Sequence, residues 1–288
     1  MAELVCTMAV AHAPGLTGWL DMATPEQQKG LKEGYAELGR ALRESRPDVI
    51  VGFSNDHILN LPLDNTPDFC VGTAAEWRGP APWFRDWLAI DEYRVGGNPE
   101  VARTLVRELD KRGIAFAFRD DLLFDDNFSV PLTTLTPRYD VPLVPVHMNC
   151  IVPPVPSAAR CFEVGRHVAE IVRDALPKGM RVAILGTGGL SHDPGGPRYF
   201  QIDEEFDRWF LKLMEDGAAE RAIAECTLDR LRAAGDGGTP ELLAWFVPWG
   251  AAQGGKARVV CYEPTVAMRC GMGGVVWDRA PVALEAAS

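Results

Sequence analysis

The sequence is poor in the features that mark membrane, secreted and nucleic-acid-binding proteins. No apolar run among its 288 residues approaches the roughly 20 residues that a membrane-spanning helix needs. The N-terminus, MAELVCTMAV, lacks the basic start and small-residue cleavage site of a signal peptide. Lys and Arg number 29 against 40 Asp and Glu, a net charge of -11, and the basic residues form no cluster. We therefore expect neither a membrane nor a nucleic acid as partner.

The cysteines of the sequence form no recognisable motif. The seven cysteines stand singly and no CxxC pair occurs, so neither a disulfide framework nor a zinc motif is indicated. Such a set is typical of reduced core thiols, and we expect a cytoplasmic protein. A hydrophobic content of 47% is enough for a sizeable core.

Short apolar, β-branched segments alternate with helical patterns along the whole chain. This alternation predicts an α/β fold in which helices cover a mixed, largely parallel central sheet. No repeat and no long Ser/Gly linker divides the chain, so we expect one three-layer α/β/α domain over residues 1–288. The expected strands are 4–10, 48–53, 114–118, 142–146, 181–186 and 258–262.

Helix signals lie between these strands. Apolar residues at helical spacing predict a helix around 31–42, and Asn98 and Ser157 are expected to begin two more. A fourth is expected over 202–215. The segment 61–94 is irregular and rich in Pro and Trp, which is typical of a cover over a site or a partner surface.

Four of the five histidines follow expected strands. In an open α/β sheet, residues beyond the carboxyl ends of the strands converge on one cleft. A single histidine in such a place is commonly a loop hydrogen-bonder, but His12 and His57 both stand beside small or turn-forming residues that leave room for a ligand. The four are His12, His57, His147 and His192.

A carboxylate could complete a metal site with two of these histidines. In GDGGTPELLAW, Thr239 is predicted to cap a helix and Pro240 to begin it, which places Glu241 in the first turn. Two imidazoles and one carboxylate form the facial triad that holds Fe(II). The alternative is that Glu241 only complements the helix dipole.

The stretch GTGGLSH, residues 186–192, brings another histidine to the same edge. Its glycines let the backbone pass close to a ligand and leave the His192 imidazole free to take or give a proton near neutral pH. It matches neither a GxGxxG nor a Walker motif, so nucleotide binding is not indicated.

The ordered set HAPG, SNDH, VPL, NCIVPPVPSAARCF, GTGGLSH, IDEEFDRWFLKLM and PELLAW resembles the class III, LigB-type extradiol ring-cleavage dioxygenases. It is most similar to the β subunit of protocatechuate 4,5-dioxygenase and to gallate dioxygenases. The resemblance runs from about residue 5 to about residue 277.

The resemblance implies an Fe(II) cofactor held by His12, His57 and Glu241, with His192 as acid/base residue. It implies opening of an aromatic or heteroaromatic ring with O2, where the ring carries vicinal hydroxyls or a hydroxyl and an amine. The protocatechuate enzyme has a small helical α subunit, so a separate small partner or a homo-oligomer is expected to close the pocket.

The chain departs from the family pattern at Asp125-Asp126-Asn127, where relatives typically have Asp-His-Gly. Asp126 therefore stands in the place of a histidine. It could serve as a base, or as acceptor for an N–H or cationic group of the substrate. Alternatively His147 replaces the missing imidazole, or the oxygenase activity has been lost.

A last candidate lies in EPTVAMRCGMGG, which resembles the segment at the substrate end of the family's pocket. Arg269 could bind an anionic substituent of the substrate, because guanidinium suits a planar anion. Alternatively it pairs with a structural carboxylate such as Glu263. Two other functions stay open on the same scaffold: a binding protein without oxygenase activity, and a metal-dependent hydrolase that uses His192.

Overall fold

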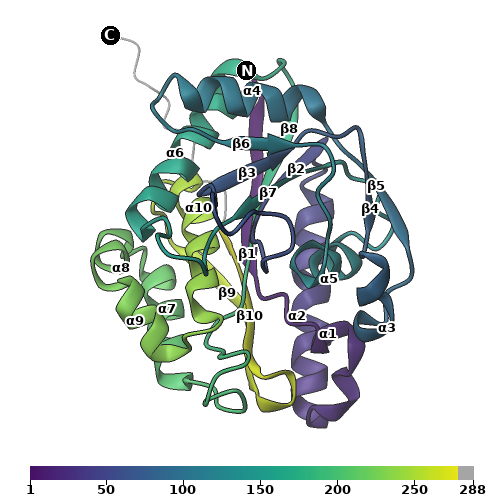
Figure 1. Cartoon of the computed structure of the whole chain (residues 1–288), viewed down its shortest axis with the longest axis vertical. Coiled ribbons are helices and arrows are strands. Elements are labelled where there is room, and N and C mark those ends of the chain that lie inside the picture. Colours follow the sequence, from purple (N-terminus) through teal and green to yellow (C-terminus); the bar gives the residue numbers. More distant parts are fainter. Residues whose placement is uncertain (278–288) are drawn as a thin grey trace.

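The computed structural model describes residues 1–277, which are built around one eight-stranded sheet in the order β6-β3-β7-β2-β8-β1-β10-β9 (Figure 1). Its centre is parallel, because β8 pairs in parallel with both β1 and β2, and β2 with β7. Antiparallel pairs add β10, β9 and β3. The predicted mixed, largely parallel sheet is confirmed. The strands are β1 (Glu3–Val10), β2 (Val49–Asn55), β3 (Phe69–Gly72), β6 (Ala117–Arg119), β7 (Leu143–Met148), β8 (Arg181–Thr187), β9 (Ala257–Thr265) and β10 (Cys270–Trp277).

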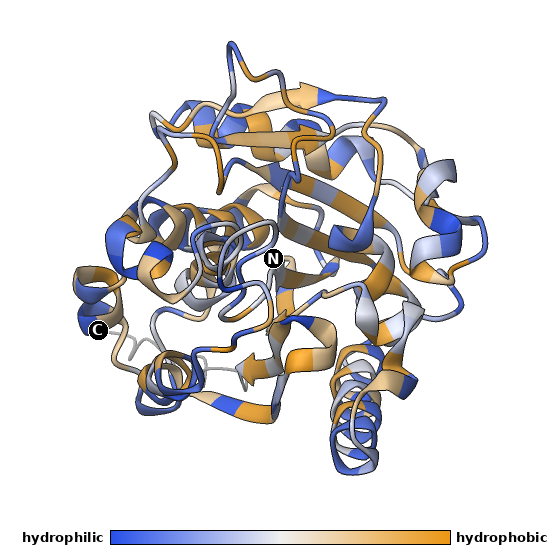
Figure 2. Ribbon diagram, turned by 60° about the horizontal axis from the view of Figure 1, so that its bottom comes forward, coloured by the Kyte–Doolittle hydropathy of each residue, from blue (hydrophilic) through white to orange (hydrophobic). Residues whose placement is uncertain are grey.

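Helices cover both faces of this sheet and complete the three predicted layers. Each face has its own apolar core, one packed beneath α6 and α10 and the other beneath α2 and α5. Figure 2 shows the consequence: the strands are largely hydrophobic, and the helices on either side alternate between hydrophobic and hydrophilic residues along their length. The first face carries α4 (Pro99–Asp110), α6 (Ala158–Ala175), α7 (Glu204–Asp216) and α10 (Leu243–Ala251), and the second carries α2 (Pro25–Glu44) and α5 (Asp126–Leu135).

The predicted helix starts follow from local capping chemistry. Asn98 accepts a hydrogen bond from the Val101 amide at the start of α4, and Ser157 accepts one from the Arg160 amide at the start of α6. Both predictions are confirmed. The helix expected over 202–215 begins slightly later, because Asp203 provides its cap.

Three regions differ from the sequence-based expectations. The strand expected over 114–118 is reduced to β6 at the sheet edge. Strands β3 and β10 were not predicted, because FCVG is short and CGMGG is rich in glycine, which depresses strand propensity. The irregular segment 61–94 holds β4 (Glu76–Gly79), which pairs with β5 (Tyr93–Gly96), and the short helix α3 (Arg85–Leu88).

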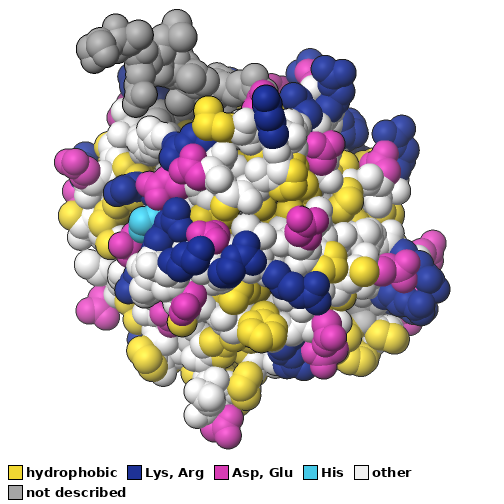
Figure 3. All heavy atoms as spheres, turned by 90° about the horizontal axis from the view of Figure 1, so that it is seen from above, with side chains coloured by type: hydrophobic (Ala, Val, Ile, Leu, Met, Phe, Trp, Pro, Cys, Tyr) yellow, Lys and Arg dark blue, Asp and Glu magenta, His cyan; other side chains and the backbone are white. Residues whose placement is uncertain are grey.

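On the face seen from above, acidic and basic side chains are interspersed with hydrophobic ones (Figure 3). Ion pairs between partly exposed side chains include Arg112–Glu170 and Arg166–Glu170. Within residues 1–277, every helix is too short or too polar to span a bilayer.

Candidate functional site

The loops that follow β1, β8 and β2, three neighbouring strands, open onto one cavity of about 380 Å³. His12 follows β1, His57 follows β2, and Gly189 and His192 follow β8. The sheet order therefore brings together residues from distant parts of the chain. Other residues lining the cavity are Ala13, Pro14, Trp19, Ile58, Phe84, Trp87, Asp125, Asp126, Ile151, Pro194, Tyr199, Gly237, Glu241, Met268, Arg269 and Cys270.

His12 is buried, and its ring orientation is fixed by Thr187 on β8. The Nδ1 atom of His12 lies 2.6 Å from Oγ1 of Thr187, and that hydroxyl donates its hydrogen to the Asn127 carbonyl. The hydroxyl must therefore accept from His12, so Nδ1 carries the proton. The other ring nitrogen, Nε2, therefore faces Glu241 and lies 3.3 Å from its Oε2 atom.

His57 has the same arrangement with a different partner. Its Nδ1 atom lies 3.0 Å from Oδ2 of Asp125, and its Nε2 atom lies 3.0 Å from Oε1 of Glu241. Burial alone would lower the pKa of His57, but Asp125 and its neighbouring carboxylates hold it well above the ordinary value. Asp125 also caps α5 by accepting a hydrogen bond from the Asn127 amide, which fixes the carboxylate against His57.

His192 is held by its own loop. Its Nδ1 donates to the Leu190 carbonyl over 2.7 Å, and its Nε2 atom faces Glu241, 3.6 Å from Oε1. Its backbone N–H donates to Oγ1 of Thr239. The prediction that Thr239 caps a helix is wrong, because its hydroxyl binds the His192 backbone and makes no capping bond.

Glu241 lies at the centre of these three imidazoles. It belongs to a short 3₁₀ helix, Thr239–Leu242, and is 2% exposed. The Gly189 amide donates to Oε2 and the Asn55 side-chain amide donates to Oε1. Burial alone would raise the pKa of Glu241, but His192 and His57 hold it well below the ordinary value.

The Nε2 atoms of three histidines thus converge on one buried carboxylate. Anchoring the second ring nitrogen to an oxygen acceptor is the arrangement that orients histidines as metal ligands. Two imidazoles with a carboxylate suit a divalent transition metal. Ligand atoms of His12, His57 and Asp126 also lie within 4.8 Å of one another. His12 and His57 together with one carboxylate, either Glu241 or Asp126, therefore fit a metal ion.

Asp126 is 9% exposed and faces this cluster from the first turn of α5. Its Oδ1 atom lies 3.4 Å from Nδ1 of His57. Burial raises the pKa of Asp126 to about 6, against the lowering effect of His57. The stretch FDDNFSVPL is therefore a helix start in the wall of the cavity.

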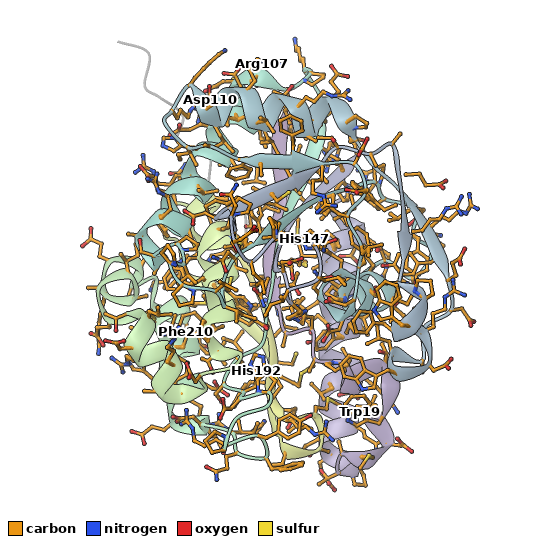
Figure 4. The ribbon with its side chains drawn as sticks, viewed as in Figure 1. Trp19, Arg107, Asp110, His147, His192 and Phe210 are labelled. Atoms are coloured by element: carbon orange, nitrogen blue, oxygen red, sulfur yellow. The ribbon has the colours of Figure 1, made fainter. Side chains whose placement is uncertain are left out.

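His147 is not one of the residues that line the cavity. It lies within β7 and is fully buried, and its Nδ1 atom contacts Oδ1 of Asp56 at 3.1 Å. Figure 4 shows it among the strands, farther into the sheet than His192. The structure thus places His147 outside the cavity, and its position does not support the suggestion that it replaces the missing histidine. Burial alone would raise the pKa of Asp56, but His147 holds it below the ordinary value.

Arg269 lines the cavity and is surrounded by aromatic rings. Its guanidinium lies 4.6 Å from the centre of the Tyr199 ring, 5.4 Å from Phe200 and 5.8 Å from Trp19. Among the residues that the structure describes, no carboxylate forms an ion pair with it. The alternative pairing of Arg269 with Glu263 is therefore wrong.

The sequence did not predict the contacts of three polar groups in the site: the Asp125 carboxylate and the hydroxyls of Thr187 and Thr239. Asp125 stands beside Asp126, and Thr187 stands within GTGGLSH, so both motifs contained the signal. Their role depends on ring orientation, which spacing alone does not give.

Comparison with known proteins agrees with this arrangement. Residues 6–273 match the family described as the catalytic LigB subunit of aromatic ring-opening dioxygenase. A 2,3-dihydroxyphenylpropionate/2,3-dihydroxicinnamic acid 1,2-dioxygenase of Photorhabdus laumondii is 30% identical over 73% of this chain and 62% of its own length. A gallate dioxygenase of Pseudomonas putida is 27% identical over 57% of this chain and 48% of its own length.

The alignments thus span about three fifths and about half of these two relatives. Among solved structures, an uncharacterized protein of Escherichia coli K12 shares the fold, with a TM-score of 0.54 and 16% identity. That similarity covers 94% of this chain and 100% of the other.

Proposed function

The chain belongs to the family of catalytic LigB subunits of aromatic ring-opening dioxygenases, and on this premise we propose that it is an Fe(II)-dependent extradiol-type dioxygenase. Its substrate would be an aromatic or heteroaromatic ring with vicinal hydroxyls, or with a hydroxyl and an amine. The observation that carries the proposal is the convergence of the His12 and His57 Nε2 atoms on Glu241.

His12, His57 and Glu241 would hold the iron. An Fe(II) ion with these three ligands would have coordination positions left open and would supply the redox chemistry that ring opening with O2 requires. The hydrogen bonds from Nδ1 of His12 and His57 to Thr187 and Asp125 orient both rings, so that their Nε2 atoms would be available to a bound ion.

His192 would move protons during the reaction. Its Nδ1 proton is committed to the Leu190 carbonyl, so exchange takes place at Nε2, which lies on the cavity side beside Glu241. Burial alone would lower the pKa of His192, but Glu241 holds it above the ordinary value. We therefore assign His192 as the acid/base residue for the substrate hydroxyl.

Asp126 and Arg269 would set the substrate preference. The Asp126 carboxylate stands where relatives carry an imidazole, and it can accept a proton or a hydrogen bond from an O–H or N–H group of the ring. Arg269 is the cavity's one arginine and lacks a carboxylate partner among residues 1–277, so it can bind an anionic substituent. The relative from Photorhabdus is named for a substrate that carries such an anion.

The aromatic residues of the cavity would enclose the substrate. Phe84 and Trp87 line it and come from the irregular segment 61–94, in which Trp83 is 63% exposed. The expected closing partner, a separate small subunit or a second copy of this chain, stays a prediction that the mass of the purified assembly would test.

The test is O2 uptake by anaerobically reconstituted protein with a panel of catechols, aminophenols and dihydroxypyridines. We expect one iron per chain and stoichiometric O2 consumption with ring opening for one class of substrate. Protein that keeps no iron would refute the dioxygenase. Zinc retention with hydrolysis and no O2 uptake would instead support the metal-dependent hydrolase.

A further inference from the structure

Asp207 is a fully buried carboxylate that the proposed mechanism does not use. It lies on α7, outside the cavity, and is 0% exposed. Within residues 1–277 no lysine, arginine or histidine forms an ion pair with it. Burying a carboxylate without a cation is costly unless hydrogen bonds compensate, so its contacts should show what it does.

One side of Asp207 holds the loop that carries His192. The backbone N–H of Ser191 donates to Oδ1 over 2.7 Å, and the Ser191 hydroxyl donates to Oδ2 over 2.9 Å. The Asp203 amide in turn donates to the Ser191 hydroxyl oxygen. Ser191 is therefore clamped twice, one residue before His192 and one after Leu190, whose carbonyl fixes the His192 ring.

The other side of Asp207 holds the hairpin that carries Arg269. The Tyr262 hydroxyl on β9 donates to Oδ2 over 2.9 Å. On β10 the Gly271 amide donates to the Ser191 carbonyl. A Cβ atom at Gly271 would lie 2.1 Å from Oδ2, so a glycine is needed for this close approach. One carboxylate thus joins the His192 loop to the strand that begins after Arg269.

We propose that Asp207 is a positioning residue that acts through Ser191 to fix the orientation of the His192 ring in the cavity. The inference rests on the proposed role of His192. The Ser191 arm transmits the effect, because the two residues flanking Ser191 carry the ring and the carbonyl that orients it. The Tyr262 arm ties the same carboxylate to the hairpin and does not reach His192.

The test compares Ser191→Ala and Asp207→Ala with Asp207→Asn, which keeps one oxygen for the Ser191 amide. With iron and 2,3-dihydroxyphenylpropionate or a better substrate from the panel, we expect kcat to fall about tenfold or more in both alanine variants, since acid–base catalysis depends on placement. KM and iron content should stay within about twofold of wild type. Asp207→Asn should restore most of kcat.

Tyr262→Phe is the matched control, because it removes a hydrogen bond to the same Oδ2 atom on the side away from His192. Its kcat should stay near that of wild type. If Asp207→Ala does not fold, the comparison of Ser191→Ala with wild type and Tyr262→Phe is sufficient to test the proposal. A kcat unchanged in Ser191→Ala, or lowered equally by Tyr262→Phe, would overturn the proposal.

A second readout does not depend on ring opening. Nitrogen NMR of the metal-free protein reports which ring nitrogen of His192 carries the proton. At a pH high enough to keep the ring neutral, wild type and Tyr262→Phe should show Nδ1–H as the single tautomer, and Ser191→Ala a mixture of the two tautomers. If wild-type protein has no dioxygenase activity but this difference appears, the proposed function fails while the positioning role stands. A single Nδ1–H form in Ser191→Ala overturns the positioning role.

Discussion

The Nε2 atom of His57 lies 3.0 Å from Oε1 of Glu241, although 184 residues separate them along the chain. Hydrogen bonds fix both groups in place. His57 bonds to Asp125, and Glu241 accepts from the backbone amide of Gly189 and the side-chain amide of Asn55. Neither side chain must rotate far to share an ion. The site is therefore preorganised, which keeps the cost of ordering ligands low when a metal binds.

The first prediction separates metal binding from proton transfer. His12→Ala and Glu241→Ala should each abolish stoichiometric iron binding, because each removes a ligand. His192→Ala should retain about one iron per chain and lose roughly 100-fold or more in kcat, as expected for a missing acid/base group. Metal analysis of the desalted proteins measures the first effect and O2 uptake the second. Full iron retention in both ligand variants would refute the assigned ligands.

The second prediction concerns Asp126, which lies 3.4 Å from His57. Asp126→His introduces the histidine that the family resemblance implies at this position, so we expect the preference to shift from substrates with an N–H or cationic group toward catechols. Asp126→Ala should lower kcat for both classes. Relative kcat/KM across the panel measures the shift. If both variants keep the turnover and preference of wild type, Asp126 serves only as a helix-start residue.

Most of the site's composition could be predicted because parallel strands end at a common edge. His12, His57 and His192 each follow a strand that the sequence marks clearly, and the sheet order brings those ends together. The same rule failed for His147, because β7 continues to Met148 and the histidine lies within the strand, facing Asp56. Whether a side chain near a strand end lies in the cavity or in the core therefore depends on a shift of one or two residues in where the strand ends.

Contacts that depend on side-chain direction could not be predicted. The bonds that the His12 ring donates to Thr187 and the His192 backbone N–H donates to Thr239 join residues on separate elements, and such contacts leave no periodic pattern in the sequence. Strand β10 could not be predicted for a related reason. Its glycines allow other groups to approach the backbone closely, as Asp207 does at Gly271, but glycine also lowers the strand propensity of the segment.

The third prediction concerns Arg269 at the aromatic end of the cavity. Arg269→Met should raise KM for 2,3-dihydroxyphenylpropionate by roughly 10- to 100-fold, the loss expected for a charge-assisted hydrogen bond of about 1.5–3 kcal/mol. Unsubstituted catechol should be nearly unaffected. Arg269→Lys keeps the charge and should recover part of the affinity. Equal losses for both substrates would show that Arg269 supports the cavity wall and does not bind the anion.

The fourth prediction concerns Ile58, which lines the cavity in a left-handed conformation with φ of 60°. This conformation is unfavourable for a β-branched side chain, and Ile58 is 52% exposed, so burial compensates little. Ile58→Asn should therefore stabilise the protein by about 1 kcal/mol in urea denaturation. Ile151→Asn is the control, because that residue lines the same cavity without a positive φ. If both substitutions change the free energy of unfolding equally, the backbone of Ile58 is not strained by its positive φ.

The last prediction uses the pH dependence of stability. Burial raises the pKa of Asp207 to about 6 from an ordinary value of 3.8, against the lowering hydrogen bonds from Ser191. The folded state therefore holds this proton more tightly than the unfolded chain. Between pH 4 and 6 the folded carboxyl must lose its proton at a cost, so its contribution to the free energy of unfolding falls by roughly 3 kcal/mol as pH rises.

Asp207→Asn replaces the carboxyl with a neutral group of the same shape and removes this titration. The difference in free energy of unfolding between Asp207→Asn and wild type should grow in favour of the variant as pH rises from 4 to 7, and should level off above. Other groups, Asp126 among them, titrate in both proteins and cancel in the difference. Urea denaturation at intervals of one pH unit measures it. A difference that is constant with pH would show that Asp207 titrates normally, and that its buried hydrogen bonds compensate fully for the loss of solvent.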